Sequence, residues 1–576
     1  MALMSGGLVL AAFGPLFAAW PGVASPYVLP KLTMLAFAAF VASLGALRSA
    51  PESKGGTPDL LRPLAVCLAA LALACLFSGD RIVGFLGEYS QRGYGFLTLA
   101  LCAAAAALAQ SAGEARARRV LSFGAVAGAV LAAIGMLQTA GLDPVLNDIG
   151  SLAYGRVGSW VGSPIGLGCA LAMLLPLQMR LALDGEDPGT RRIGWACLAL
   201  GTLGLVFTWS RGAWLAAAVG AGCYLYWTER RPGLKSRWAS IAAAILAAGA
   251  LLLALRFVRP TGDSDLGRLE VWRTAWNMFA AHPVFGIGPD AFSLMLGRYK
   301  TPGFVRVYGE AGAQAHAHND FLQVLATMGI VGFGAYVLLL SAAWRRLQNA
   351  LRDEGTRAGA AAAGAGLTAA FVVAKFNPLP LDALALAAVL LGLLDPRGGR
   401  ARGVSLAASG LGAAGLLLSF WMLAADRHCM TGFRAQHEGR LDDARASYAA
   451  AAAVNPAEAR YGYWLVGLLR SQAREETDPA RRRKLLEESV SAARVMERWN
   501  PLDPRALHAL GGSLTALAAE GGKESAAEAA PILERGVRAD WSDRSMIKTR
   551  MAAAALRGDR GAYEDCVARL ARLGAP

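Results

Sequence analysis

The sequence predicts an all-α protein, in which a polytopic bundle of membrane-spanning helices precedes a tail of paired helices outside the membrane. Two features of the composition indicate a membrane protein: 55% of the 576 residues are hydrophobic and only 17% are charged, and the mean hydropathy is +0.38. A third observation separates the tail, because the sequence becomes polar and rich in alanine after about residue 426. We therefore expect a membrane domain at residues 1–425 and a helical domain at residues 426–576.

Long apolar runs define the membrane domain. A helix needs about 20 apolar residues to cross a bilayer, and about 12 or 13 runs approach or reach this length. They cover residues 5–20, 28–47, 60–77, 94–109, 120–140, 164–179, 193–208, 212–227, 238–257, 321–343, 358–374, 380–394 and 404–425.

Basic residues distinguish the two sides of this bundle. One set of alternate loops is rich in Arg and Lys, as at residues 116–119, 191–192 and 345–357. The other short loops hold only Arg81, Arg92, Arg156, Arg211 and Lys375. Because cytoplasmic loops carry the excess of basic residues, the amino terminus is expected in the cytoplasm and the tail on the outer face. The net charge of +15 then reflects topology and gives no indication of nucleic-acid binding.

The longest outer segment is the loop at residues 259–320. Its first part contains apolar residues at helical spacing, namely Leu269, Trp272, Trp276 and Phe279. This pattern predicts an amphipathic helix whose aromatic face lies on lipid or on the bundle. We expect Ser264 or Asp265 near its amino cap and expect the helix to end before Pro283.

The loop ends in QAHAHNDFLQVLATMG, residues 314–329, which holds two of the chain's six His. Titratable groups at a membrane edge are costly unless they have a function. His316 and His318 alternate as on an extended segment, where they would point in opposite directions, and this argues against a metal pair. A neutral His can act as a general base. A simple turn or helix cap remains open, since Asn319 and Asp320 are natural amino-cap residues.

Two arginines near this segment suit an anionic ligand. Arg211 lies in TWSRGAW on a tight outer turn, and Arg268 lies on the amphipathic helix. A guanidinium group matches a pair of phosphate oxygens. The alternative is that Arg211 only reaches the membrane interface and that Arg268 is an ordinary solvated charge. Arg92 follows Glu88 and Tyr89 just before a span, where a local ion pair competes with a functional role.

The tail contains a two-helix pattern typical of tetratricopeptide repeats. Its first unit has small residues at Gly439 and Ala444, an aromatic residue at Tyr448 and a turn at Asn455. The Asn-Pro turn recurs at Asn500, so the period is about 40–45 residues. Such units stack into an α-solenoid with a concave face. The sequence also allows a disulfide between the two outer cysteines, Cys429 and Cys566.

Three motifs carry a resemblance: TWSRGAW, GRLEVWRTAWNMFAAHPVFGIGPDAF and HAHNDFLQVLATMGIVG. In order, spacing and outer-face placement they resemble the O-antigen ligase and O-antigen polymerase family of membrane glycan transferases. The motif region covers about residues 159–340. YSQRGYGFL and GSPIGLGCALAMLLPL are also similar to stretches of such proteins.

The resemblance implies a GT-C-like bundle in the bacterial inner membrane with a periplasmic tail. It implies inverting, metal-independent transfer of a glycan from undecaprenyl diphosphate to an acceptor hydroxyl, as in lipopolysaccharide biosynthesis, with no cofactor. By motif, Arg211 and Arg268 would hold the diphosphate and His318 would activate the hydroxyl. Further substrate contacts are expected from Arg92, His316, Asn319, Lys375, Arg156 and Trp272.

Alternatives concern the acceptor and the reaction. Ligation to lipid A-core, polymerisation of O-antigen or exopolysaccharide units, and O-linked transfer to a protein all remain open. The tail suggests a protein or glycan partner. The non-enzymatic alternative is a transporter of lipid-linked glycan, whose charges should line a path within the spans. Here they gather on one face, which favours chemistry at one leaflet.

Overall fold

Helices make up the regular structure of the chain in a computed structural model that describes residues 2–48, 60–142, 156–228, 262–398 and 402–574. No strand occurs within these residues, which confirms the predicted all-α class.

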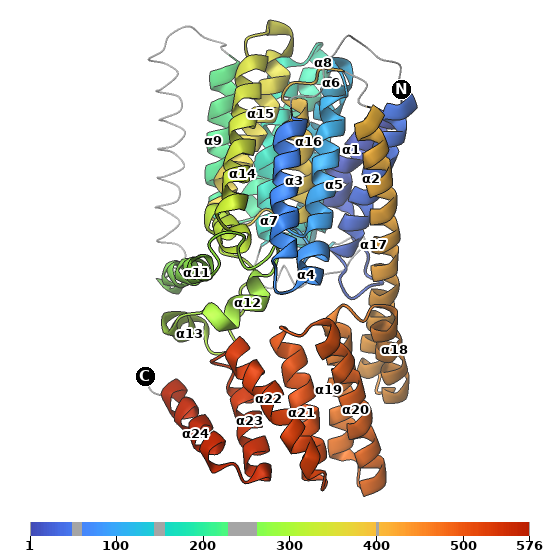
Figure 1. Cartoon of the computed structure of the whole chain (residues 1–576). Coiled ribbons are helices and arrows are strands. Elements are labelled where there is room, and N and C mark those ends of the chain that lie inside the picture. The colour runs from blue at the N-terminus through green and yellow to red at the C-terminus, as the bar shows by residue number, and fades with distance from the viewer. Residues whose placement is uncertain (1, 49–59, 143–155, 229–261, 399–401, 575–576) are drawn as a thin grey trace.

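The longer helices stand side by side in one bundle, which forms the upper part of Figure 1. They are α1 (Ala2–Phe17), α2 (Leu29–Arg48), α3 (Leu61–Leu76), α5 (Phe96–Gln110), α6 (Glu114–Thr139), α7 (Pro164–Asp184), α8 (Pro188–Phe207), α9 (Arg211–Trp227), α14 (Asp320–Ala350), α15 (Glu354–Ala374), α16 (Leu381–Leu393) and α17 (Arg402–His437). Each predicted span within the described residues coincides with one of them, whereas the span predicted at 238–257 lies outside the described residues.

Six of the described helices are long and apolar enough to cross a membrane, by length and composition: α2, α6, α7, α14, α15 and α17. The chain is therefore a multi-pass membrane protein, as the hydropathy predicts.

Small residues let the bundle helices pack closely. Helix α7 is buried on every side between Leu167 and Leu174. A Cβ atom at Gly392 of α16 would lie 2.2 Å from the carbonyl oxygen of Ala106 on α5, so only glycine fits there. Such close approach strengthens van der Waals packing, which drives helix association in a membrane.

Shorter helices cover the lower end of the bundle in Figure 1: α4 (Arg81–Leu86), η2 (Ser159–Val161), α11 (Gly262–Ala281), α12 (Phe292–Tyr299) and α13 (Pro302–Tyr308). Helix α11 ends before Pro283, as predicted. It begins at Gly262, so Ser264 and Asp265 lie in its first turn, near the amino cap as predicted. Asp is favoured there by the helix dipole.

Helix α11 packs on the protein with a stripe that is not its aromatic face. The buried residues Val271, Ala275 and Met278 are at most 1% exposed. On the predicted aromatic face, Leu269 is 42% exposed and Trp276 is 55% exposed. Trp272 and Phe279 are half-buried, so the predicted aromatic face is only partly turned away from the bundle.

Helix α14 is broken one-third of the way along its length. Gly329 has φ 63° and ψ −163°, which interrupts the helix predicted to run without a break. The segment after α11 fills the break: the N–H of Ile330 donates to Pro283 O at 2.8 Å, and the N–H of Ile287 donates to Ala326 O at 2.9 Å. The first turns of α14 are thereby attached to the outer loop as well as to the bundle.

The tail continues directly from α17, which crosses the predicted boundary at residues 425 and 426 without a break. Its other helices are α18 (Leu441–Val454), α19 (Ala459–Glu475), α20 (Pro479–Trp499), α21 (Pro504–Ala519), α22 (Lys523–Ala539), α23 (Arg544–Arg557) and α24 (Arg560–Gly574). They form successive antiparallel pairs (Figure 1). Their assignment as tetratricopeptide repeats stays a prediction. A disulfide in the tail is excluded, because Cys429 and Cys566 are free thiols buried in separate clusters.

The tail contacts the bundle end at two places. At the carboxyl-terminal half, Lys300 forms an ion pair with Asp540 at 2.9 Å, and Arg544 Nε donates to Glu310 Oε2 at 2.8 Å. At the amino-terminal half, Arg460 pairs with Glu88 of the α4–α5 loop at 2.8 Å. These contacts hold the outer loop between the bundle and the tail.

Candidate functional site

The residues that lead into α14 carry both histidines. Asn319 caps the helix: its Oδ1 accepts the N–H of Phe321 at 3.0 Å and that of Leu322 at 3.2 Å, which confirms the predicted cap. His318 has a φ of 53°, in the left-handed region. The extended conformation predicted for this segment is therefore wrong at His318, because the chain must turn sharply to present Asn319 to the helix.

The imidazole of His318 has one bonded and one free nitrogen. Its Nε2 lies 3.1 Å from Gln314 Oε1. In the tautomer in which Nε2 donates to this amide oxygen, Nδ1 carries the lone pair. Nδ1 is buried and has no hydrogen-bond partner among the described residues. A basic nitrogen with a free lone pair is what a general base requires.

The surroundings of His318 keep it neutral and yet prepare it for a proton. Burial and the nearby Arg268 lower the pKa of His318 below its usual value. The amide of Asn377 and the main chain of Phe376 lie beside the ring and favour its protonated form, although neither makes a hydrogen bond of normal geometry with Nδ1. The ring is thus uncharged near pH 7, with groups at hand that stabilise an imidazolium.

His316 lies deeper than His318. It is 4% exposed, and its ring meets the edge of Tyr94 with the ring centroids 5.4 Å apart. Burial and then the neighbouring His318 lower the pKa of His316 to about 3. His316 is therefore neutral at physiological pH and fixes the segment to the α4–α5 loop.

A tight turn between α8 and α9 presents Arg211. Arg156 Nε donates to the carbonyl oxygen of Thr208 at 3.0 Å, and Trp214 Nε1 donates to Leu205 O at 2.8 Å. Arg211 is the first residue of α9, so its charge adds to the partial positive charge of the helix terminus. The contact of Arg156 with Thr208 stabilises this turn.

Arg268 and Trp272 lie one turn apart on α11. Arg268 is half-buried and forms no hydrogen bond or ion pair with a described residue. It lies close enough to favour the ionised form of Tyr308 and the neutral form of His318. The indole N–H of Trp272 is buried without an acceptor among the described residues. This part of α11 therefore offers a charge and a donor to a ligand rich in oxygen atoms.

The arginine turn and the histidine segment meet at the loop between α15 and α16. A Cβ atom at Gly212, the residue after Arg211, would lie 3.7 Å from Asn377 Nδ2 and 3.6 Å from Phe376 Cβ. These same two residues lie beside His318, which lies beside Arg268. The fold thus places Arg268 beside His318, and it connects the turn that carries Arg211 to His318 through Phe376 and Asn377.

Lys375 lies nearby, but its charge is already paired. Its Nζ lies 2.7 Å from Asp320 Oδ2 and stands over the rings of Phe321 and Phe371, at 3.4 and 3.8 Å from their centroids. Asp320 also accepts the hydroxyl of Tyr336 at 2.6 Å. This arrangement favours a structural role for Lys375 at the start of α14, in place of the phosphate contact that the sequence suggests.

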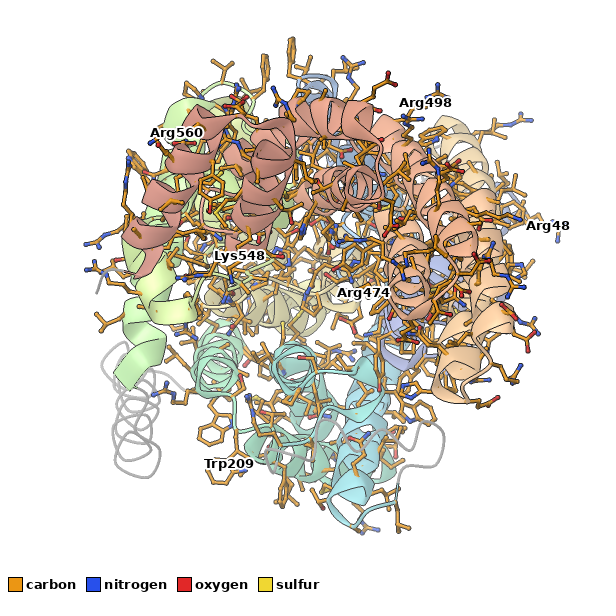
Figure 2. All side chains as sticks on the ribbon, turned by 90° about the horizontal axis from the view of Figure 1, so that it is seen from below. Arg48, Trp209, Arg474, Arg498, Lys548 and Arg560 are labelled. Atoms are coloured by element: carbon orange, nitrogen blue, oxygen red, sulfur yellow. The ribbon has the colours of Figure 1, made fainter. Side chains whose placement is uncertain are left out.

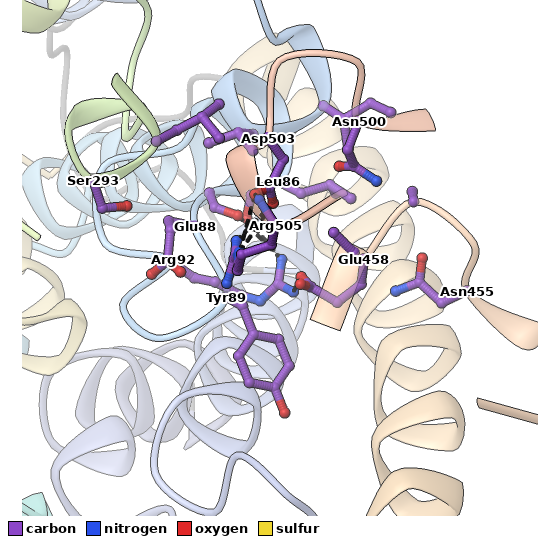
Figure 3. Close-up of a pocket in the computed structure, with 16 residues that line it drawn as sticks. Leu86, Glu88, Tyr89, Arg92, Ser293, Asn455, Glu458, Asn500, Asp503 and Arg505 are labelled. Atoms are coloured by element: carbon purple, nitrogen blue, oxygen red, sulfur yellow. Dashed lines mark hydrogen bonds and ion pairs between the residues drawn. The ribbon is translucent and has the colours of Figure 1, made fainter. Parts of the chain in front are cut away.

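Arg92 lies in a different place, at the junction with the tail. It is 2% exposed, and its Nη2 forms an ion pair with Glu458 Oε2 at 3.2 Å. Figure 3 shows these two side chains pointing toward each other in a small pocket, with Arg505 and Asp503 beside them. Arg92 therefore connects the α4–α5 loop to the tail, and the structure does not bring it to His318.

Sequence reasoning missed Asn377 and Gln314 as members of the site. Asn377 lies in AKFNPLP, where the lysine drew attention, and a buried Asn before Pro on an outer turn is the signal that was available. Gln314 precedes the histidines, and only the turn at His318 brings its amide to the imidazole. Among the described residues, no three His, Cys, Asp or Glu side chains are grouped as metal ligands.

The site lies at one end of a bundle whose helices include six that are long and apolar enough to cross a membrane. Residues 196–337 match the model of a protein family described as O-Antigen ligase. The matched residues include Arg211, Arg268 and His318, and exclude Lys375 and Asn377. The match supports the O-antigen ligase family and, with it, a glycosyltransferase-like activity. No curated protein matches the chain at a significant level.

Proposed function

We propose that this protein transfers a glycan from a polyprenyl diphosphate carrier, such as undecaprenyl diphosphate, to an acceptor hydroxyl. The observation that carries the proposal is Arg268 beside the buried His318, with the turn that carries Arg211 packed against Phe376 and Asn377, which also lie beside His318. Neither arginine forms a hydrogen bond or ion pair with a described residue. A diphosphate leaving group needs its developing charge stabilised, and guanidinium groups supply this stabilisation. The O-antigen ligase match supports the same class of donor.

The proposed step is a single displacement. His318 Nδ1 takes the proton of the acceptor hydroxyl while the hydroxyl oxygen attacks the anomeric carbon of the donor. The bond between that carbon and the phosphate oxygen breaks, and the polyprenyl diphosphate leaves with the electron pair. Arg211 and Arg268 bind the oxygens that gain charge. Attack from the face opposite the leaving group inverts the anomeric configuration.

The proposed location is the outer, periplasmic face of the inner membrane. The bias of basic loops assigns the opposite end of the bundle to the cytoplasm. The partly exposed aromatic face of α11, at the same end as the site, fits the membrane interface, where a lipid-linked donor presents its diphosphate. Ligase-type transfer of a finished glycan is the version that we propose.

The test is transfer by the purified protein in lipid nanodiscs, with a defined undecaprenyl-diphosphate oligosaccharide and candidate acceptors. We expect product without added divalent metal, and expect Arg211→Ala and Arg268→Ala each to slow transfer by about 100-fold or more. Arg81→Ala is the matched control, since Arg81 is an exposed arginine at the same end of the bundle. Full activity of both site variants would overturn the proposal.

Product size and acceptor separate the remaining versions. A single added chain supports a ligase, whereas a ladder of repeat units identifies a polymerase. Label that appears on a peptide identifies a protein glycosyltransferase. Movement of the donor across the membrane with no new glycosidic bond would identify a transporter and refute the proposal.

A variant pair tests the role of Lys375. Lys375→Met leaves Asp320 charged and unpaired in a mostly buried position, so we expect a loss of about 3 kcal/mol in stability. The double variant Asp320→Asn with Lys375→Met removes both charges, and we expect it to recover most of that stability and to retain glycan transfer. Thermal unfolding in detergent and the transfer assay give the two readouts. A double variant that is stable but inactive would show that Lys375 contacts the substrate.

A further inference from the structure

The tail has an inner face formed by alternate helices. Helices α19, α21 and α23 contact one another in series, while α20, α22 and α24 pack mainly against these neighbours from the other side. Helices that approach each other line the concave side of a stacked array. Side chains that α19, α21 and α23 direct away from α20, α22 and α24 therefore share one surface.

Three basic residues on this inner face form no hydrogen bond or ion pair with a described residue: Arg470, Arg474 and Lys548. Arg470 and Arg474 follow one another on one side of α19, and burial together with Arg474 lowers the pKa of Arg470. The guanidinium of Arg470 lies over α21, where a Cβ atom at Gly512 would be 2.7 Å from its Nη1. Like charges are thus held together with no carboxylate bound to them.

Arginines elsewhere in the tail are mostly paired, and several pairs join neighbouring helices. Examples are Arg445–Glu488, Arg482–Glu520, Arg494–Glu528, Arg535–Glu497 and Arg550–Asp565. Figure 2, seen along the bundle from the tail side, shows Arg474 and Lys548 on the inner side of the arc of tail helices and Arg498 and Arg560 on its outer side. The basic residues of the inner face thus keep their positive charge, whereas most arginines elsewhere in the tail are neutralised by carboxylates.

The same face also offers flat and aromatic surface. Tyr463, about two helical turns before Arg470 on the same side of α19, is 43% exposed. Its neighbour Trp464 packs on Phe433 of α17, with the ring centroids 4.8 Å apart. At Gly467 no atom lies within 4 Å of where a Cβ would be, so the surface between the Tyr463 ring and the arginines is open. Exposed rings with a polar edge stack on the apolar faces of sugar rings, and the neighbouring cations attract carboxylates.

Two acidic residues border the face without neutralising it. Asp543 lies close to His508, whose Nε2 is 3.3 Å from Thr549 Oγ1 between α21 and α23. Glu310 lies near Lys548, but its carboxylate is bound by Arg544. Glu310 belongs to the loop that leads to Gln314 and His318, so Lys548 lies beside the loop that carries the candidate site.

We propose that the inner face of the tail binds an acidic glycan, one that carries uronic acid or similar carboxylate groups. This inference rests on the proposed function, because it assigns to the tail the glycan that the site joins or receives. The position of Lys548 beside the loop that carries His318 favours a glycan over a separate acidic protein, since a glycan is the substrate of the proposed site.

The test is calorimetric titration of the full-length protein in nanodiscs with an oligogalacturonate, a neutral malto-oligosaccharide of equal length, and a poly-glutamate peptide. We expect the uronate to bind most tightly and its affinity to fall as salt increases. Arg474→Glu with Lys548→Glu should weaken uronate binding by about tenfold or more, which corresponds to about 1.4 kcal/mol or more. Arg498→Glu with Lys484→Glu makes the same charge change at exposed positions of α20 and should leave affinity within about twofold.

Three results would overturn the inference: equal binding of the acidic and neutral sugars, equal loss in both double variants, or tighter binding of poly-glutamate than of uronate. The proposed function is tested apart from it. His318→Asn should retain uronate binding while it abolishes transfer. Intact transfer by the wild-type protein without uronate binding would refute only the role of the tail.

Discussion

We expect His318→Asn to slow glycan transfer by about 100- to 10,000-fold, the usual contribution of a general base. Asparagine suits this test because it tolerates the left-handed backbone that His318 adopts, so the loss reports on the missing base and not on strain. The measurement is the single-turnover rate with a defined lipid-linked donor. The matched control is His428→Asn, which changes an exposed histidine on α17 and should leave the rate unchanged.

The pH dependence should identify the same residue. The pKa of His318 is lowered by burial and by Arg268, so His318 stays neutral to a pH below that of a free histidine. The acidic limb of the rate profile should therefore lie below about pH 6.5. Removing Arg268 takes away one cause of the lowering, so in Arg268→Gln the limb should move to higher pH, whatever the residual rate. A limb that stays in place would contradict the assignment of His318 as the titrating base.

The second large effect is structural and concerns the break in α14. Gly329 has a φ of 63°, and a Cβ atom there would lie 2.3 Å from Val284 O. Gly329→Ala must therefore either displace the segment after α11 or close the break, and both changes disturb the first turns of α14. We expect a loss of at least about 2 kcal/mol in stability, together with loss of transfer. Thermal unfolding and limited proteolysis of the outer loop are the measurements.

Gly334 provides the control for this substitution. It lies five residues further along the same helix, with no atom within 4 Å of where its Cβ would be. Gly334→Ala should therefore be neutral or stabilise the protein by up to about 1 kcal/mol, because alanine favours helix. If Gly329→Ala were equally harmless, the broken helix would not be a determinant of the site.

Local patterns allowed several features to be predicted. The apolar runs placed every bundle helix that lies in the described residues, because helix length and the cost of exposing polar groups to lipid act on contiguous sequence. The cap at Asn319 follows from its own side chain, which bonds to backbone atoms only two and three residues away. The end of α11 before Pro283 is equally local.

The sequence did not show which basic residues of the outer loops would form ion pairs within the protein. Arg92, Lys375 and Arg211 are all basic residues in short outer loops, and nothing in their neighbours along the chain separates them. Arg92 is paired with Glu458, which is 366 residues away, and Lys375 is paired with Asp320 across two helices. Arg211 forms no hydrogen bond or ion pair with a described residue.

Local sequence patterns were sufficient to predict an all-α, multi-pass membrane protein with a polar helical tail, because hydrophobicity and helix signals are carried by short stretches of chain. Which charges remain available to a ligand depends on the packing of the whole chain. That outcome depends on ion pairs and burial between segments hundreds of residues apart. Among the described residues, the packing left Arg268 without an ion pair beside His318 and Arg211 without one on the turn that packs against Phe376 and Asn377. It also left Arg470, Arg474 and Lys548 without an ion pair to a described residue on the inner face of the tail.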